Sequence, residues 1–193
     1  MKIYLASASP RRQELLRQLG ISFEVVSSNL IETRAAGDTP EDYVMRVALD
    51  KARLVATRVR ERNLSTRPVV GADTEVVLDG EVLGKPRDRA HGLAMLRALQ
   101  GRTHEVLTAL ALLHEGGEHT AFSRSRVSLA PMTDAEIARY WASGECADKA
   151  GGYAIQGRAA AYIERLDGSY SGVMGLPLYE LVRLFKEAGL TLL

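Results

Sequence analysis

Apolar and polar positions along the chain follow two spacings that alternate with each other. Short β-prone runs predict strands over residues 2–6, 23–27, 69–73, 75–78, 81–83, 105–114, 119–129, 153–155 and 162–165. Apolar residues three or four positions apart predict helices over residues 10–19, 40–62, 89–99, 134–142 and 177–188. The alternation of these elements predicts an α/β fold around a mixed sheet.

Capping and turn residues sharpen several of these boundaries. The pairs Ser9–Pro10 and Thr39–Pro40 each offer a capping hydroxyl and then a proline, whose missing N–H costs nothing at the first helical position. Residues 133–136 have the spacing of a capping box. The pair Asp79–Gly80 lies between two short β-prone runs and therefore predicts a type I′ hairpin.

Composition narrows the class of protein. A chain of 193 residues has the size of one domain, which we expect to span residues 1–193. Its 25 basic and 24 acidic side chains leave a formal charge of +1, and proteins that bind duplex phosphate usually carry a basic excess, so we expect no nucleic-acid partner. Cys146 is the single cysteine, which fits a reducing compartment. The chain start is too weakly apolar for a signal peptide, and no run of about 18 apolar residues follows. We therefore expect a cytoplasmic protein that has no membrane partner.

The stretch SASPRR places Arg11 and Arg12 in the first turn of the first predicted helix. Cations are disfavoured there, because the helix dipole already makes that end positive. A strand that ends in small residues such as Ser7 and Ser9 exposes free backbone N–H groups at the helix start, and these bind anions. Two guanidinium groups add bidentate donors. The pattern indicates a site for more than one phosphate group, and the alternative is two solvated surface arginines.

The stretch GADTEVVLDGEVLGKP carries the second group of candidates. An apolar strand is predicted to deliver Asp73 at its end, where a carboxylate of an α/β sheet often meets a ligand. Lys85 follows the hairpin, between a glycine and a proline. A carboxylate near an anion site repels phosphate unless it coordinates Mg²⁺ or activates water. The alternative for Asp73 is that it caps a turn.

Glu32 and Lys51 give weaker signals, whereas the stretch around Gln156 is a third informative one. Glu32 falls in a polar loop after a strand, and Lys51 lies in the middle of a helix; most such residues are solvated. The stretch KAGGYAIQG contains glycines that allow close backbone approach, and Gln156 can bind the donor and acceptor edges of a base. An ordinary tight connection is the alternative for this stretch.

The motifs SASPRR, GADT, LGKP, DKAGGYAIQG and GSYSGVMGLPL, taken in this order, resemble the Maf family of nucleoside triphosphate pyrophosphatases over about residues 2–188. The form AGGYAIQG is similar to the branch that acts on dTTP and UTP. The resemblance implies a mixed, strongly bent β-sheet flanked by helices, with a cleft between two lobes, as in the inosine triphosphate pyrophosphatases, and commonly a homodimer. It also implies hydrolysis between the α- and β-phosphates with a divalent metal cation, Mg or Mn.

Carried over by position, the resemblance implies that Asp73 is the proton acceptor. Residues tied to substrate choice are Arg11, Thr74 and Gln156. The other polar residues of the cleft are Arg12, Glu32, Lys51 and Lys85, with Ser7 and Ser9 in the loop before the helix. Glu32 and Asp73 are the candidate metal ligands. The segment before Glu32, which reads SSNLIE, is less acidic than is typical of the family.

Two other functions fit the same residues. A purine house-cleaning enzyme acting on a triphosphate such as ITP would keep the chemistry and change the base, and Gln156 argues mildly against it. A regulator of septum formation, the role from which the family takes its name, would bind a nucleotide, a nucleic acid or a protein without catalysis. The balanced charge argues against the nucleic acid.

Overall fold

The computed structural model describes residues 1–192, so the expected end of the domain at residue 193 lies outside the described residues. In chain order the elements are β1 (Lys2–Leu5), α1 (Pro10–Gln18), β2 (Ser22–Val25), α2 (Pro40–Glu61), β3 (Val69–Leu78), β4 (Glu81–Leu83), α3 (Arg89–Leu99), β5 (Thr103–His114), β6 (Gly117–Leu129), α4 (Asp134–Ala142), the 3₁₀ turns η1 (Ala150–Gly152) and η2 (Arg158–Tyr162), β7 (Ile163–Asp167), α5 (Tyr170–Met174) and α6 (Leu178–Glu187). The predicted α/β class is confirmed.

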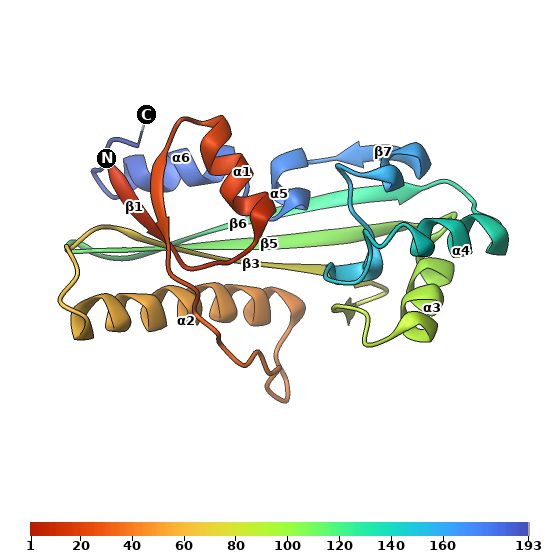
Figure 1. Ribbon diagram of the computed structural model, residues 1–193, viewed down its shortest axis with the longest axis horizontal. Helices are drawn as coiled ribbons and strands as arrows, with labels where there is room; N and C mark the ends of the chain where they lie inside the picture. Colours follow the sequence, from red (N-terminus) through yellow and green to blue (C-terminus); the bar gives the residue numbers. More distant parts are fainter. Residues whose placement is uncertain (193) are drawn as a thin grey trace.

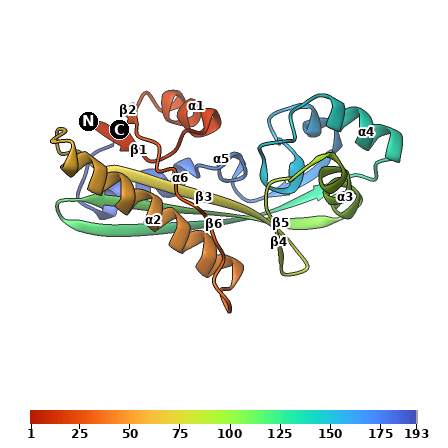
Figure 2. The same ribbon diagram turned by 60° about the horizontal axis from the view of Figure 1, so that its bottom comes forward.

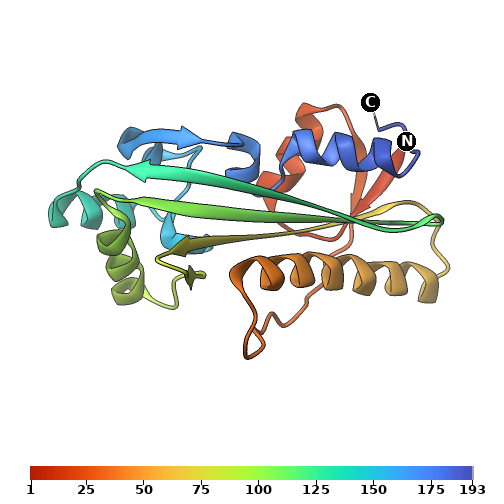
Figure 3. The same ribbon diagram turned by 180° about the vertical axis from the view of Figure 1, so that it is seen from behind.

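The strands form one mixed sheet in the order β2-β1-β3-β5-β6-β7, with β4 added on β3. Strand β1 runs parallel to β2 and β3, and the remaining pairs are antiparallel. The long strands β3, β5 and β6 extend through the whole molecule (Figures 1 and 3). They therefore connect the two ends of the structure as a shared platform.

Each face of the sheet carries its own apolar core. Helix α2 covers one face, where Val44, Ala48 and Val55 pack against strands β1, β3 and β5. Helices α1 and α6 cover the other face, where Leu16 and Phe185 are fully buried (Figure 1). Because side chains of a strand alternate between faces, each residue of β3 is assigned to one of these two environments.

The helices gather into two lobes at the two ends of the long strands (Figure 2). One lobe holds β1, β2, α1, α2 and α6, and the other holds β4, α3, α4 and η1. Within residues 1–192, none of the helices combines the length and the apolar character needed to cross a bilayer. The two-lobed arrangement and the mixed sheet agree with the fold that the resemblance implied.

Most of the predicted helix starts are confirmed with their caps. The Thr39 side chain accepts a hydrogen bond from the Asp42 N–H, and the capping box of Thr133 and Glu136 forms in both directions. Ser9 is an exception, because it occupies the N-cap position of α1 but its hydroxyl makes no capping bond. The first N–H groups of α1 therefore keep their capacity to bind another acceptor.

Two strand predictions were wrong in extent or type. Residues 69–73 and 75–78 are not separate runs but one strand, which pairs with β5 from Val69 through Val77. Asp73 consequently lies within a strand and not at its end. Residues 153–155 are not a strand, because their backbone bonds elsewhere: the Ala154 N–H donates to the Tyr140 hydroxyl at 2.9 Å. The hairpin at 79–80 is confirmed, with positive φ at both residues.

Candidate active site

A cavity of about 640 Å³ opens at the edge of β3, a size typical of ligand sites. Strand β1 pairs with β3 only as far as Val70, and β4 joins β3 from Val76 onward. Between these points, residues 71–75 have no neighbouring strand on this side within the described part of the chain. The divergence of β1 from β3 therefore leaves a gap in the sheet that side chains from both faces can reach.

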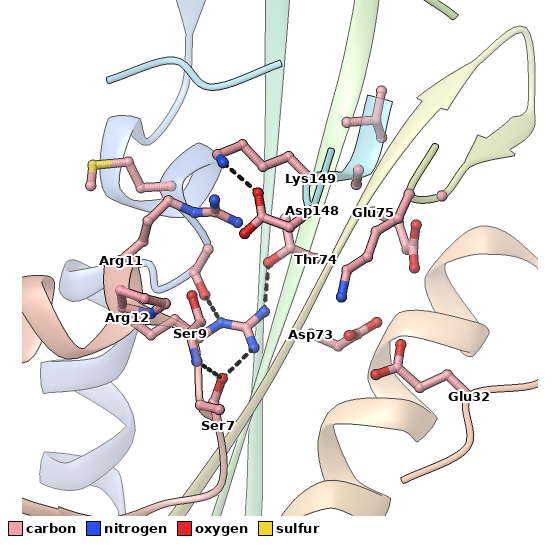
Figure 4. A pocket seen from close by; sticks show the side chains of 18 of the residues that line it. Ser7, Ser9, Arg11, Arg12, Glu32, Asp73, Thr74, Glu75, Asp148 and Lys149 are labelled. Atoms are coloured by element: carbon pink, nitrogen blue, oxygen red, sulfur yellow. Dashed lines mark hydrogen bonds and ion pairs between the residues drawn. The ribbon is translucent and has the colours of Figure 1, made fainter. Parts of the chain in front are cut away.

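Arg12 lies on the α1 side of this gap and is bonded on every nitrogen of its guanidinium group. Its Nε donates to the Gly175 carbonyl at 2.8 Å, its Nη1 to the Ser7 hydroxyl at 3.0 Å, and its Nη2 to the Thr74 hydroxyl at 3.2 Å. Buried Thr108 donates to the Gly172 carbonyl at 2.8 Å and lies 3.1 Å from the Thr74 hydroxyl. This side of the site is thus fixed by contacts within the protein (Figure 4).

Asp73 lies on the α2 side of the same gap and is 4% exposed. The buried Lys51 ammonium lies 2.7 Å from Asp73 Oδ1 and 2.7 Å from Glu32 Oε1. Gly71 allows this approach, because a Cβ there would lie 2.3 Å from the Ala48 carbonyl oxygen of α2. The absence of a side chain at position 71 therefore allows α2 to pack closely on β3, which places Lys51 beside Asp73.

Glu75 also faces the cavity, and the sequence analysis did not single it out. It is 7% exposed and lies two residues after Asp73, so the alternation of the strand puts both carboxylates on one face. Carboxylate oxygens of Glu32, Asp73 and Glu75 all lie within 4.8 Å of one another (Figure 4). Recognition of one uninterrupted strand through GADTEVV would have revealed this residue.

The cavity lining brings together all the candidate residues of the sequence analysis, which are Ser7, Ser9, Arg11, Arg12, Glu32, Lys51, Asp73, Thr74, Lys85 and Gln156. They come from the β1–α1 loop, from the first turn of α1, from the segment between β2 and α2, from α2, from β3, from the segment after β4 and from the segment after η1. The two arginines and Asp73 therefore share one pocket, although they lie on opposite sides of β3 (Figure 4). Asp148 and Lys149, which line the same cavity, were not predicted.

Burial dominates the electrostatics of the carboxylates. Burial raises the pKa of Asp73, while the charges of Lys51 and Arg12 act in the opposite direction. Burial, with the negative charge of Asp73, raises the pKa of Glu75 to about 8. Burial also lowers the pKa of Arg12. The α2 side thus gathers carboxyl groups whose charged forms are disfavoured by burial.

Comparison with known proteins places this geometry in a family. Residues 2–188 match the model of the Maf-like protein family. The chain belongs to this family. Its match covers the lobes, the long strands and every residue of the cavity described above, so the resemblance seen in the five sequence motifs is confirmed over nearly the whole chain.

Two bacterial relatives named dTTP/UTP pyrophosphatase are about half identical to this chain. The protein of Alkalilimnicola ehrlichii is 53% identical over 96% of this chain and 92% of its own length. The protein of Ralstonia nicotianae is 50% identical over 98% of this chain and 95% of its own length. Among solved structures, the Ham1 protein of Staphylococcus aureus superposes with a TM-score of 0.43 and 17% identity, covering 69% of this chain and 73% of that one.

Proposed function

We propose that this protein is a nucleoside triphosphate pyrophosphatase that hydrolyses dTTP and UTP to the nucleoside monophosphate and pyrophosphate, with one domain spanning residues 1–193. The observation that carries the proposal is the single cavity that joins the start of α1 to the Lys51–Asp73 pair. The names of relatives about half identical over nearly the full chain support the same reaction and the same bases.

The triphosphate binds at the start of α1 in this proposal. The helix offers backbone N–H groups that the Ser9 side chain leaves free, and the positive end of the helix dipole favours an anion. Arg11 and Lys85 line the cavity and add positive charge. Arg12 fixes the Ser7 loop against Thr74 and Gly175, so it holds this side of the pocket in shape for the substrate.

Asp73 accepts a proton from the water that attacks the α-phosphorus, and pyrophosphate leaves. Its Oδ1 is held by Lys51 at 2.7 Å, whereas its Oδ2 is buried and has no hydrogen-bond partner among residues 1–192. Lys51 therefore orients the carboxylate and favours its charged form. Donors such as Lys51 and Lys85 also stabilise the negative charge that develops on the phosphoryl oxygens, which can be worth roughly 3–4 kcal/mol for one well-placed donor.

The site fits a divalent cation by the chemistry of its donors. Carboxylate oxygens are the ligands that Mg²⁺ and Mn²⁺ prefer, and Asp73 Oδ2, which has no partner among residues 1–192, supports a site for such an ion. Glu32 and Asp73 would hold the ion. When bound, the ion supplies positive charge to the phosphate oxygens and activates water.

Gln156 selects the base in this proposal, because it lines the same cavity and can both donate to and accept from a pyrimidine edge. A site that pairs its polar groups with one base discriminates strongly against a base that leaves them unpaired. Thr74 takes part in substrate choice through the Arg12 guanidinium that it holds.

A panel of nucleotides tests the proposal. Pyrophosphate release is measured for dTTP, UTP, CTP, dGTP and ITP, each with Mg²⁺ and with Mn²⁺. We expect fast release from dTTP and UTP, and equal rates on dGTP would contradict the choice of base. Preferred release from ITP would favour a purine enzyme, and no release from any nucleotide would favour a binding role. Light scattering coupled to gel filtration tests the expected homodimer.

A further inference from the structure

Glu75 is a buried carboxylate with one oxygen that no described residue donates to. It is 7% exposed, its Oε2 is fully enclosed, and that oxygen has no hydrogen-bond partner in the part of the chain that the structure describes. Buried carboxylates are normally hydrogen-bonded or paired, because removing a charge from water is costly. Asp73, on the same face of the same strand, has an unpartnered oxygen as well. Two enclosed oxygens of neighbouring carboxylates are therefore left unpaired in one place.

The lysine of the site does not balance these two oxygens. Lys51 contacts Glu32 Oε1 and Asp73 Oδ1, each at 2.7 Å, and so pairs with the opposite oxygen of Asp73. Glu32 has this lysine beside it, and its side chain is 35% exposed, so water can also solvate it. The charges of Arg12 and Lys85 also act on Asp73 and Glu75 respectively, but no described residue donates a hydrogen bond to either enclosed oxygen.

We propose that Glu75 is a direct ligand of the divalent cation that the proposed function uses, and that Asp73 and Glu75 form its main protein anchor. Glu32, whose side chain contacts Lys51 and is partly exposed to water, makes the smaller contribution. The statement that the ion takes part in catalysis rests on the proposed function, whereas the statement that Glu75 binds it does not. The binding of the ion itself can be measured without any nucleotide.

The donor set supports the assignment. A divalent cation would bring positive charge to two carboxyl groups whose enclosed oxygens have no donor among residues 1–192. Hard oxygen donors that converge within 4.8 Å of one another suit Mg²⁺ or Mn²⁺ and not a metal that prefers nitrogen or sulfur. The position of Glu75 on β3, which pairs with β5 across this stretch, keeps its backbone fixed before an ion arrives.

Binding of Mn²⁺ to the full chain, followed by electron paramagnetic resonance of the free ion in the absence of nucleotide, tests the proposal. We expect Glu75→Gln to weaken Mn²⁺ binding by at least about 10-fold, because even residues that only support a ligand contribute this much. Glu32→Gln is expected to have a smaller effect. Asp148→Asn removes a carboxylate from the same cavity but outside the cluster, and it is the matched control, with Mn²⁺ affinity close to that of the unsubstituted protein.

Thermal unfolding supplies a second readout. In EDTA, Glu75→Gln is expected to melt at or above the temperature of the unsubstituted protein, because it removes an unpaired buried carboxylate, and Mn²⁺ should no longer raise that temperature. Unchanged Mn²⁺ affinity in Glu75→Gln, or no Mn²⁺ binding by the unsubstituted protein, overturns the proposal. Pyrophosphate release could persist in either case, so the failure of the metal assignment is distinguishable from the failure of the proposed reaction.

Discussion

The two sides of β3 differ in how far their polar groups are hydrogen-bonded within the protein. On the α1 side, Arg12 donates hydrogen bonds to Ser7, Thr74 and Gly175, so that each nitrogen of its guanidinium group is bonded without a ligand. On the α2 side, Asp73 and Glu75 keep enclosed oxygens that no described residue satisfies. One side therefore provides a fixed shape, and the other provides unpartnered oxygens. The comparison teaches that Arg12 and the two carboxyl groups, although all ionisable, have different physical tasks.

Substitution of the proposed base is expected to have the largest effect on activity. Asp73→Asn keeps an acceptor for Lys51 but cannot take a proton from water at neutral pH, so we expect kcat to fall by about 10²–10⁴-fold. The rate of pyrophosphate release measures the loss, and calorimetric titration with dTTP checks that nucleotide binding persists. Turnover close to that of the unsubstituted protein would remove Asp73 from the role of base.

Removal of the buried lysine tests the charge of the α2 side. Lys51→Met leaves Asp73 and Glu32 without their shared cation, so we expect a loss of about 3–5 kcal/mol in the free energy of unfolding. Millimolar Mn²⁺ should restore part of this stability, because an added cation replaces the missing ammonium charge. Urea unfolding with Mn²⁺ and with EDTA measures both values, and an absence of recovery would contradict the comparison.

The matched change on the α1 side is Arg12→Met. It removes the donors to Ser7, Thr74 and Gly175, and we expect a loss of about 2–3 kcal/mol in the free energy of unfolding. Mn²⁺ should restore less of this stability than in Lys51→Met, because the lost hydrogen bonds go to neutral oxygens and Arg12 acts on Asp73 through its charge without a hydrogen bond. Equal recovery of the two variants by Mn²⁺ would show that the two sides do not differ as described.

His104 tests whether every enclosed unpartnered atom indicates a ligand. Its Nε2 lies 2.8 Å from the Tyr153 hydroxyl, its Nδ1 has no partner within residues 1–192, and burial lowers its pKa to about 4 from the ordinary value of 6.5. Between these pH values the imidazole is protonated in the unfolded chain but not in the folded chain. The contribution of neutral His104 to the free energy of unfolding is therefore fully present above pH 6.5 and is lost as the pH falls.

The expected size of the His104 effect is about 2 kcal/mol between pH 6.5 and pH 5. Urea unfolding of His104→Gln against the unsubstituted protein isolates it from the carboxylates, and the variant should lose less stability over this interval. This result would show that His104 is buried as a neutral ring and needs no ligand, in contrast to Asp73 and Glu75. Parallel pH profiles of the two proteins would contradict this account.

The sequence predicted the candidate residues better than it predicted their surroundings. The motifs identified the arginines, Asp73 and Gln156, because family order and local chemistry both point to them. The sequence pattern divides the strand that carries Asp73 in two, since the three polar residues 73–75 interrupt its apolar run. Its unbroken pairing with β5 is a long-range contact that local pattern does not contain. The omission of Glu75 follows from that division, because only a continuous strand places it beside Asp73.

By itself the sequence determined the α/β class, most helix boundaries and most of the charged residues that line the cavity. Caps, turns and apolar spacing act over a few residues and can be seen locally. Tertiary structure alone decided that β1 leaves β3 after Val70, that Gly71 admits α2, and that Lys51 pairs with Asp73 while Glu75 remains unpaired. Burial and pairing of a charge depend on segments distant in sequence, because the free energy of a carboxylate is set by what surrounds it in space.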